Sequence, residues 1–188
     1  MLPLGSEETV SKMANLDNAP GFLLYRPGAG IEPLVKWMTV KASTIVYPGQ
    51  PLTIATGYVE PGGGTAVLYA IAMGYMSSNA SRKNADDTNQ DARVLCCIDP
   101  WNHEWRTQTD GAMAATDVGK FGIATTTAAD TVTKQARNFI TYSTLVAAPG
   151  DISDNAVFEI TEIVAEHGNV AGAYCDIVVR PVRIPPVA

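Results

Sequence analysis

Residues 91–105, DARVLCCIDPWNHEW, carry more chemically capable side chains than any other stretch of the chain. Two adjacent cysteines, Cys96 and Cys97, are followed by Asp99 and His103, and tryptophans flank the histidine. Thiolate, imidazole and carboxylate groups are the ligands of zinc, and a thiol activated by a histidine is a common nucleophile. The segment therefore raises three hypotheses: a metal site, a catalytic site, or a strand that happens to carry these residues.

The spacing within this segment favours the strand. Residues 92–98 form a short apolar run that ends at the turn signal Asp99-Pro100. Because successive side chains of a strand point to opposite faces, Cys96 and Cys97 cannot both reach one ion. A buried cysteine usually behaves as a small hydrophobic residue. We therefore expect these cysteines to be free thiols packed in the core, with no metal site and no cofactor.

Other ligand-binding motifs in the chain lack a diagnostic residue. Asp87, Asn89 and Asp91 are spaced like the opening of a calcium loop, but Ile98 stands where the bidentate glutamate is needed. The glycines at 62–64 have no following Lys-Ser or Lys-Thr pair to meet a phosphate. A solvated acidic turn and a hairpin turn are the simpler interpretations.

Catalysis has little support in the sequence. There is no G-x-S-x-G motif, and nothing places a serine or cysteine near His103 or His167. Glu159 and Glu162 are spaced to lie on opposite faces of a strand, as solvated carboxylates do. We expect no catalytic residues and no enzymatic activity. A small hydrolase that uses His103 or His167 is the least favoured alternative.

Composition limits the class of protein. The 188 residues suffice for one domain, and 46% are hydrophobic while only 17% are charged. A surface so poor in charge suits contact with other proteins. The net charge of −6, with no basic cluster longer than Arg82-Lys83, argues against nucleic acid, and no apolar run is long enough to span a membrane. Without a recognisable secretion signal, we expect synthesis in the cytoplasm.

Turn residues divide the chain into short apolar pieces, which is typical of strands. We predict a mainly β fold, an antiparallel barrel or sandwich of short strands, with an extended N-terminal arm at 1–33 and a single β-rich domain at 34–188. Residues 127–138 could form a short helix, and residues 77–90 an exposed loop. The expected strands are 34–40, 44–47, 52–56, 65–76, 92–98, 103–109, 139–145, 157–164 and 173–182.

Alternating side chains support two of these strands. Cys175, Ile177 and Val179 share one face, opposite Asp176 and Arg180. Residues 103–109 alternate in the same way. Aromatic and apolar side chains in the arm and the tryptophans, which either cap the core or anchor a partner, are the candidate partner-binding residues. They are Phe22, Leu23, Leu24, Tyr25, Trp37, Trp101 and Trp105.

The order of motifs over residues 20–184 resembles the small β-rich head decoration, or cement, proteins of tailed bacteriophages. In that pattern a strand ending near Asp-Pro, here Asp99-Pro100, precedes an aromatic strand, here with Trp105, and an Asp-x-Gly turn, here at 117–120. The Cys96-Cys97 pair departs from the pattern. The segments that carry the resemblance are ASTIVYPGQPL, GTAVLYAIAMGYMS, RVLCCIDPWNHEWRTQ, AATDVGKFGIA and FEITEIVAEHGNVAGAYCDIVVRPV.

The resemblance implies a virion protein on the capsid exterior that binds major capsid proteins and stabilises the shell. It also implies a homo-oligomer, with a trimer favoured. An extended arm could add a strand to a neighbouring sheet. A head fibre base or a tail protein is the alternative within the same class.

Overall fold

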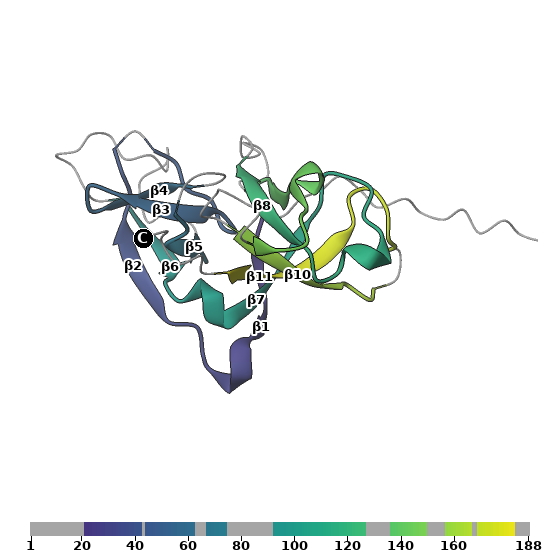
Figure 1. The fold of residues 1–188 in the computed structure, drawn as a ribbon. Coiled ribbons are helices and arrows are strands. Elements are labelled where there is room, and N and C mark those ends of the chain that lie inside the picture. Colours follow the sequence, from purple (N-terminus) through teal and green to yellow (C-terminus); the bar gives the residue numbers. More distant parts are fainter. Residues whose placement is uncertain are drawn as a thin grey trace, which may run out of the picture.

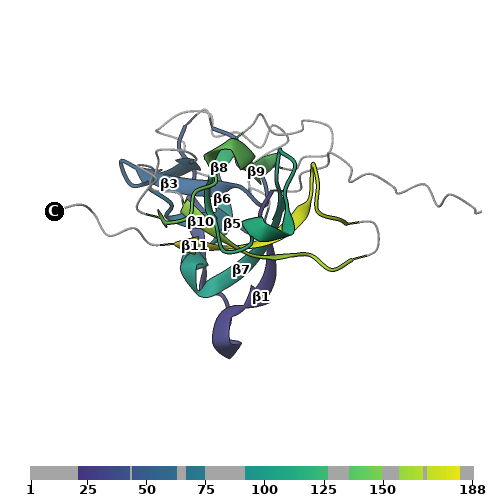
Figure 2. The same ribbon diagram turned by 45° about the vertical axis from the view of Figure 1, so that its right-hand side comes forward.

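The computed structural model describes residues 21–42, 44–62, 67–74, 92–126, 136–149, 157–166 and 169–182. Within these ranges the chain forms two antiparallel sheets that pack into a sandwich-like arrangement (Figures 1 and 2). The prediction of a mainly β fold of short antiparallel strands is confirmed, and the sheets do not close into a barrel.

The larger sheet has six strands in the order β1-β7-β11-β10-β8-β9. All of its named strand pairs are antiparallel, and a β-bulge interrupts the register of β10 against β11 between Ile160 and Glu162. The strands are β1 (Leu23–Pro27), β7 (His103–Gln108), β8 (Phe121–Thr126), β9 (Asn138–Ile140), β10 (Val157–Ile163) and β11 (Asp176–Val182).

The smaller sheet has five strands in the order β2-β6-β5-β3-β4. Its strands are β2 (Val35–Thr39), β3 (Pro51–Ala55), β4 (Tyr58–Pro61), β5 (Ala70–Ala72) and β6 (Arg93–Cys97). The described helices are single 3-10 turns: η1 (Gly28–Gly30), η2 (Pro100–Asn102), η3 (Ala115–Asp117) and η4 (Tyr142–Thr144). None of these helices is long and apolar enough to cross a membrane.

The two sheets are joined by two chain segments that run next to each other. In the larger sheet β1 pairs with β7, ending at the pair Pro27 and His103. In the smaller sheet β2 pairs with β6, beginning at Val35 and Cys97. Both segments therefore cross from one sheet to the other side by side, one through residues 28–34 and the other through residues 98–102. We call this crossing the corner.

The described residues form two hydrophobic cores. The first lies between the sheets and contains Trp105, Phe158 and Cys97, with Phe22 stacked on Phe158 at a ring-centroid distance of 4.7 Å. The second lies on the other face of the smaller sheet and contains Cys96. Neighbouring residues of one strand thus enter different cores, as the alternation of a strand requires.

Most of the strongly patterned strand predictions are confirmed to within a few residues. Several predicted segments differ from the structure. Residues 44–47 are not a strand, and Val46 instead packs into the second core. Within 139–145 a short strand is followed by η4. Within 65–76 only Ala70–Ala72 is a strand among the described residues, and strands β1, β4 and β8 were not predicted. The expected loop at 77–90 and residues 127–135 of the helix expected at 127–138 lie outside the described residues, and residues 136–138 are not helical because Asn138 begins β9.

The expected boundary of the N-terminal arm at residue 33 is wrong. Leu23–Pro27 is a strand of the larger sheet, paired with β7, and Phe22 is buried against Phe158. Burial of the aromatic side chain and the strand hydrogen bonds fix this segment in the domain. The arm prediction now concerns residues 1–20, which the structure does not describe.

The turn at Asp117 gives a prediction about acid stability. Its buried carboxylate accepts hydrogen bonds from Lys120 Nζ at 2.7 Å and from the Ala114 N–H at 2.8 Å. These partners, the lysine first, lower the pKa of Asp117 below the ordinary value of 3.8. A carboxyl whose pKa is lowered by folding stabilises the fold above its unfolded pKa and loses that effect as the pH falls through its folded pKa.

We expect Asp117→Asn to lower the free energy of unfolding at pH 7 by about 1 kcal/mol, a small value because Lys120 is exposed and its charge is screened. The difference from the wild type should decrease as the pH falls below about 4 and approach zero only below the lowered pKa of Asp117. Denaturant unfolding at pH 7 and at a series of acidic pH values measures this. A difference that stays constant with pH would show that the charge of Asp117 has no role.

Candidate functional site at the corner between the sheets

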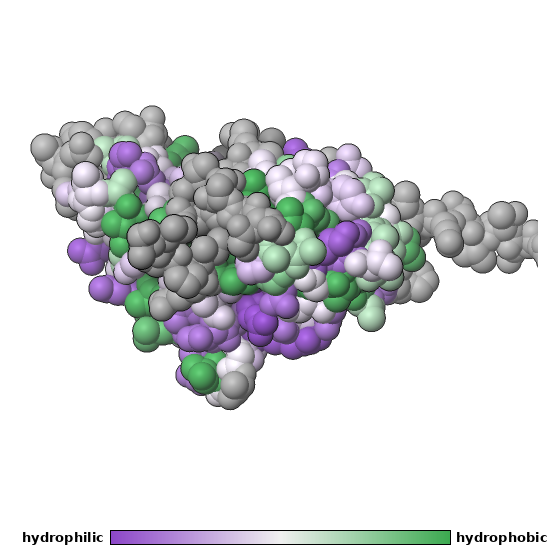
Figure 3. Space-filling model, viewed as in Figure 1, coloured by the Kyte–Doolittle hydropathy of each residue, from purple (hydrophilic) through white to green (hydrophobic). Residues whose placement is uncertain are grey.

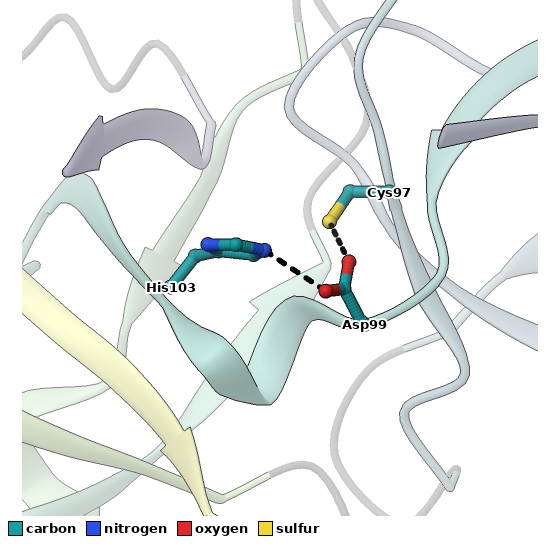
Figure 4. A group of neighbouring side chains, drawn as sticks. All are labelled: Cys97, Asp99 and His103. Carbon is teal, nitrogen blue, oxygen red and sulfur yellow. Dashed lines mark hydrogen bonds and ion pairs between the residues drawn. The ribbon is translucent and has the colours of Figure 1, made fainter. Parts of the chain in front are cut away.

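Three side chains with metal-binding or catalytic chemistry meet at the corner. Cys97 ends β6, Asp99 precedes η2, and His103 begins β7, and Figure 4 shows all three pointing toward one another. Their candidate ligand atoms lie within 4.8 Å of one another. We call Cys97, Asp99 and His103 the corner cluster.

Asp99 is the centre of the corner cluster. Its Oδ1 accepts the Leu34 N–H at 2.9 Å and the Cys97 thiol at 3.2 Å, and its Oδ2 is 3.1 Å from Nε2 of His103. One carboxylate therefore ties together both chain segments that cross the corner. Burial by itself would raise the pKa of Asp99, but the hydrogen bonds from Cys97, Leu34 and His103 outweigh it and lower that pKa.

The hydrogen bonds of His103 define which ring nitrogen carries the proton. The Gly28 N–H points at Nδ1 with a distance of 3.2 Å, so Nδ1 acts as an acceptor. The neutral ring then carries its proton on Nε2 and donates it to Asp99. The ring is fully buried, and both of its nitrogens have partners.

The approach of Gly28 depends on its lack of a side chain. A Cβ atom at this position would lie 1.7 Å from the carbonyl oxygen of Asn102. Only glycine allows the end of β1 to pass so close to the backbone of η2, and this contact brings the Gly28 N–H to His103. Just beyond, Trp105 donates its Nε1–H to the Pro100 carbonyl at 3.0 Å.

The geometry does not activate Cys97 as a nucleophile. Its thiol donates to Asp99, and His103 also donates its Nε2 proton to that carboxylate, so the histidine does not accept the thiol proton. Burial, the largest effect, raises the pKa of Cys97 to about 12. A thiol at such a pKa is almost fully protonated near neutral pH, and the thiolate is the reactive form.

One expectation about the cysteines is confirmed and another is wrong. Cys96 and Cys97 do enter different cores, so they do not share an ion. The expectation that no cysteine lies near a histidine is wrong, because η2 folds His103 back toward Cys97 with Asp99 between them. The signal was Asp99-Pro100: proline favours the first position of a helical turn, which returns the chain within a few residues.

The residues expected to bind a partner differ in how far their side chains are exposed. Trp105 and Phe22 are buried in the first core, so their side chains cannot reach a partner in this fold. Trp37 is 51% exposed and Leu23 is 43% exposed. The remaining members are partly buried: Leu24, Tyr25 and Trp101.

The two glutamates of β10 form ion pairs. Glu159 accepts from Arg180 at 2.6 Å, and Glu162 accepts from Arg26 at 2.8 and 2.9 Å. The bulge between Ile160 and Glu162 shifts the register, so the simple expectation of opposite faces fails. His167 lies outside the described residues.

Comparison with known proteins gave no relative. No family model, no curated protein and no solved structure matches the chain. The assignment of a function therefore depends on the residues and geometry described above.

Proposed function

We propose that this chain is a structural virion protein that binds the outer surface of a tailed-phage capsid and bridges neighbouring major capsid proteins. In this proposal the protein stabilises the shell through protein contacts and has no catalytic role. The order of motifs along the sequence supports the phage assignment. The apolar surface along β2 is the observation that carries the proposal of a protein partner.

This surface is formed by exposed apolar side chains on β2 and the segment before it. Ile31, Leu34, Val35 and Trp37 are 47 to 58% exposed, and Figure 3 shows hydrophobic residues among hydrophilic ones along this side of the molecule. We call these four residues the β2 surface. Contiguous exposed apolar groups on a soluble protein mark interaction sites, and tryptophan is among the residues that contribute most to binding.

The position of β2 in the smaller sheet also supports the proposal of a protein partner. It is the terminal strand of the smaller sheet and pairs with β6, while the chain just past its end, at Val40, forms a parallel bridge to Val59 of β4. A terminal strand offers unpaired main-chain groups to a neighbouring chain, which gives affinity with little demand on sequence. Weak contacts of this kind, repeated over many copies, can stabilise a shell without any single strong binding site.

The chemistry of the corner cluster also supports a protein without catalysis. The Cys97 thiol is buried and protonated, and both nitrogens of His103 are engaged in hydrogen bonds. A general base needs an accessible acceptor atom within reach of a substrate proton. The hydrolase alternative through His103 therefore has no geometric support.

We expect Trp37→Ala to weaken binding to the capsid about 30-fold, which corresponds to roughly 2 kcal/mol for a central aromatic contact. Co-sedimentation of the purified protein with heads of the phage that encodes it, stripped of this protein, measures the affinity. Val118→Ala is the control, since Val118 is 41% exposed and lies outside the β2 surface.

Equal binding by wild type and Trp37→Ala would exclude the β2 surface as the contact. Removal of residues 1–20 tests the arm separately: a loss of binding with an intact β2 surface would assign the contact to the arm. Cryo-electron microscopy of the virion distinguishes the head surface from a head fibre base or the tail. Density on a fibre or the tail would contradict capsid decoration.

A further inference from the structure

We propose that the corner cluster binds a transition metal ion of the zinc type. One thiol sulfur, one carboxylate oxygen and one ring nitrogen lie within 4.8 Å of one another, with Sγ of Cys97 3.2 Å and Nε2 of His103 3.1 Å from the oxygens of Asp99 (Figure 4). Ligand atoms on a tetrahedral zinc, with bonds of roughly 2.0 to 2.3 Å, lie roughly 3 to 4 Å apart. Small side-chain rotations would therefore close the cluster around an ion.

The donor set selects the class of ion. Calcium and magnesium prefer oxygen ligands, whereas sulfur and imidazole ligands favour zinc and related ions. Cys97 and His103 are buried, and the side chain of Asp99 is 18% exposed. An ion would therefore enter on the carboxylate side, where water can fill a fourth position.

Binding requires a change in the positions of two protons. Cys97 loses its thiol proton to water and binds as the thiolate. His103 stays neutral, but its ring proton moves from Nε2 to Nδ1, because Nε2 must offer its lone pair to the ion. The hydrogen bond from the Gly28 N–H to Nδ1 is then lost. That bond is long, at 3.2 Å, and its loss is small beside three metal–ligand bonds.

The first test uses cobalt as a spectroscopic substitute for zinc. Full-length protein, reduced and free of metal, is titrated with Co²⁺ and then with Zn²⁺. We expect a sulfur-to-cobalt charge-transfer band that saturates at one ion per chain and disappears when zinc displaces the cobalt. The absence of this band in the wild-type protein would overturn the proposal, whatever the behaviour of the variants.

Cys96 provides a matched control, because it is the adjacent cysteine and enters the other core. The band should persist in Cys96→Ser, disappear in Cys97→Ser, and require at least tenfold more cobalt in His103→Gln. Circular dichroism verifies that each variant is folded. A band that persists in folded Cys97→Ser, or that is lost in folded Cys96→Ser, would place the ion elsewhere.

The proton shift provides a readout that needs no substitution in the cluster. Nitrogen NMR of the histidine rings should show His103 changing from the Nε2–H form to the Nδ1–H form when zinc is added, together with a shift of the Gly28 amide signal. Saturation with zinc without either change would overturn the proposal. These measurements use no capsid, so their outcome is independent of the proposed virion function.

Discussion

Gly28→Ala is expected to lower the free energy of unfolding by about 3 kcal/mol or more. The new Cβ atom would lie 1.7 Å from the carbonyl oxygen of Asn102, which is backbone and cannot rotate away as a side chain would. The two segments that cross the corner must then move apart, which breaks the hydrogen bond from the Gly28 N–H to His103. Overpacking of this kind, combined with an unpaired buried group, belongs to the severe class of substitutions. Denaturant unfolding followed by fluorescence measures the loss.

Gly74→Ala is the control for the glycine substitution. A Cβ atom at Gly74 would meet only the Cβ of Leu95 at 3.7 Å, which is an ordinary contact. We expect its effect to be within about 0.5 kcal/mol. A loss of less than about 1 kcal/mol in Gly28→Ala would mean that the two crossing segments do not pack as described.

Asp99→Ala is expected to cost about 3 kcal/mol of folding stability. The substitution removes the acceptor of three donors: the buried Nε2–H of His103, the thiol of Cys97 and the N–H of Leu34. Each buried donor left without a partner costs about 1 to 3 kcal/mol, with a thiol at the low end because it is a weak donor. Equilibrium unfolding of the metal-free protein measures the effect without any contribution from an ion.

Two further substitutions separate the loss of hydrogen bonds from the loss of a charge. Asp99→Asn keeps one acceptor oxygen, so we expect it to cost about half as much as Asp99→Ala. Asp110→Ala removes an exposed carboxylate that accepts one hydrogen bond, from the Tyr142 N–H at 2.7 Å, and should cost below about 1 kcal/mol. Equal losses in Asp99→Ala and Asp110→Ala would refute the central role of Asp99.

The residues of the corner cluster would have different roles in the metal-free and the metal-bound protein. Without an ion, Asp99 stabilises the corner by accepting hydrogen bonds from Cys97 and His103. With an ion, the same three side chains would act as ligands, and the ion would replace the protons as the link between the strands. Added zinc should therefore raise the stability of the wild type and leave Asp99→Ala nearly unchanged.

Local patterns in the sequence were enough to predict the class of fold. The alternation against Asp176 and Arg180 is observed in β11 and at the residue before it: Cys175, Ile177 and Val179 all enter the first core. The divergence of the two adjacent cysteines is observed as well. These features follow from the extended backbone of a strand, whose side chains alternate whatever the strand packs against.

Burial of individual aromatic residues was not predictable in the same way. Trp37 and Trp105 have the same side chain and both lie in strands, yet one is half exposed and the other is fully buried. β2 is a terminal strand, while β7 has β1 and β11 on either side. The number of neighbouring strands and the contact between sheets determine exposure, and neither is encoded in a local pattern.

The amino-acid sequence by itself therefore determined that short antiparallel strands form the protein, and which residues of one strand share a face. Only the tertiary structure decided that β1 belongs to the larger sheet and that Cys97, Asp99 and His103 meet. The physical reason is that the cluster depends on two segments, residues 28–34 and 98–102, turning together between two sheets. That turn is set by long-range strand pairing and by the close backbone contact at Gly28, which no local periodicity contains.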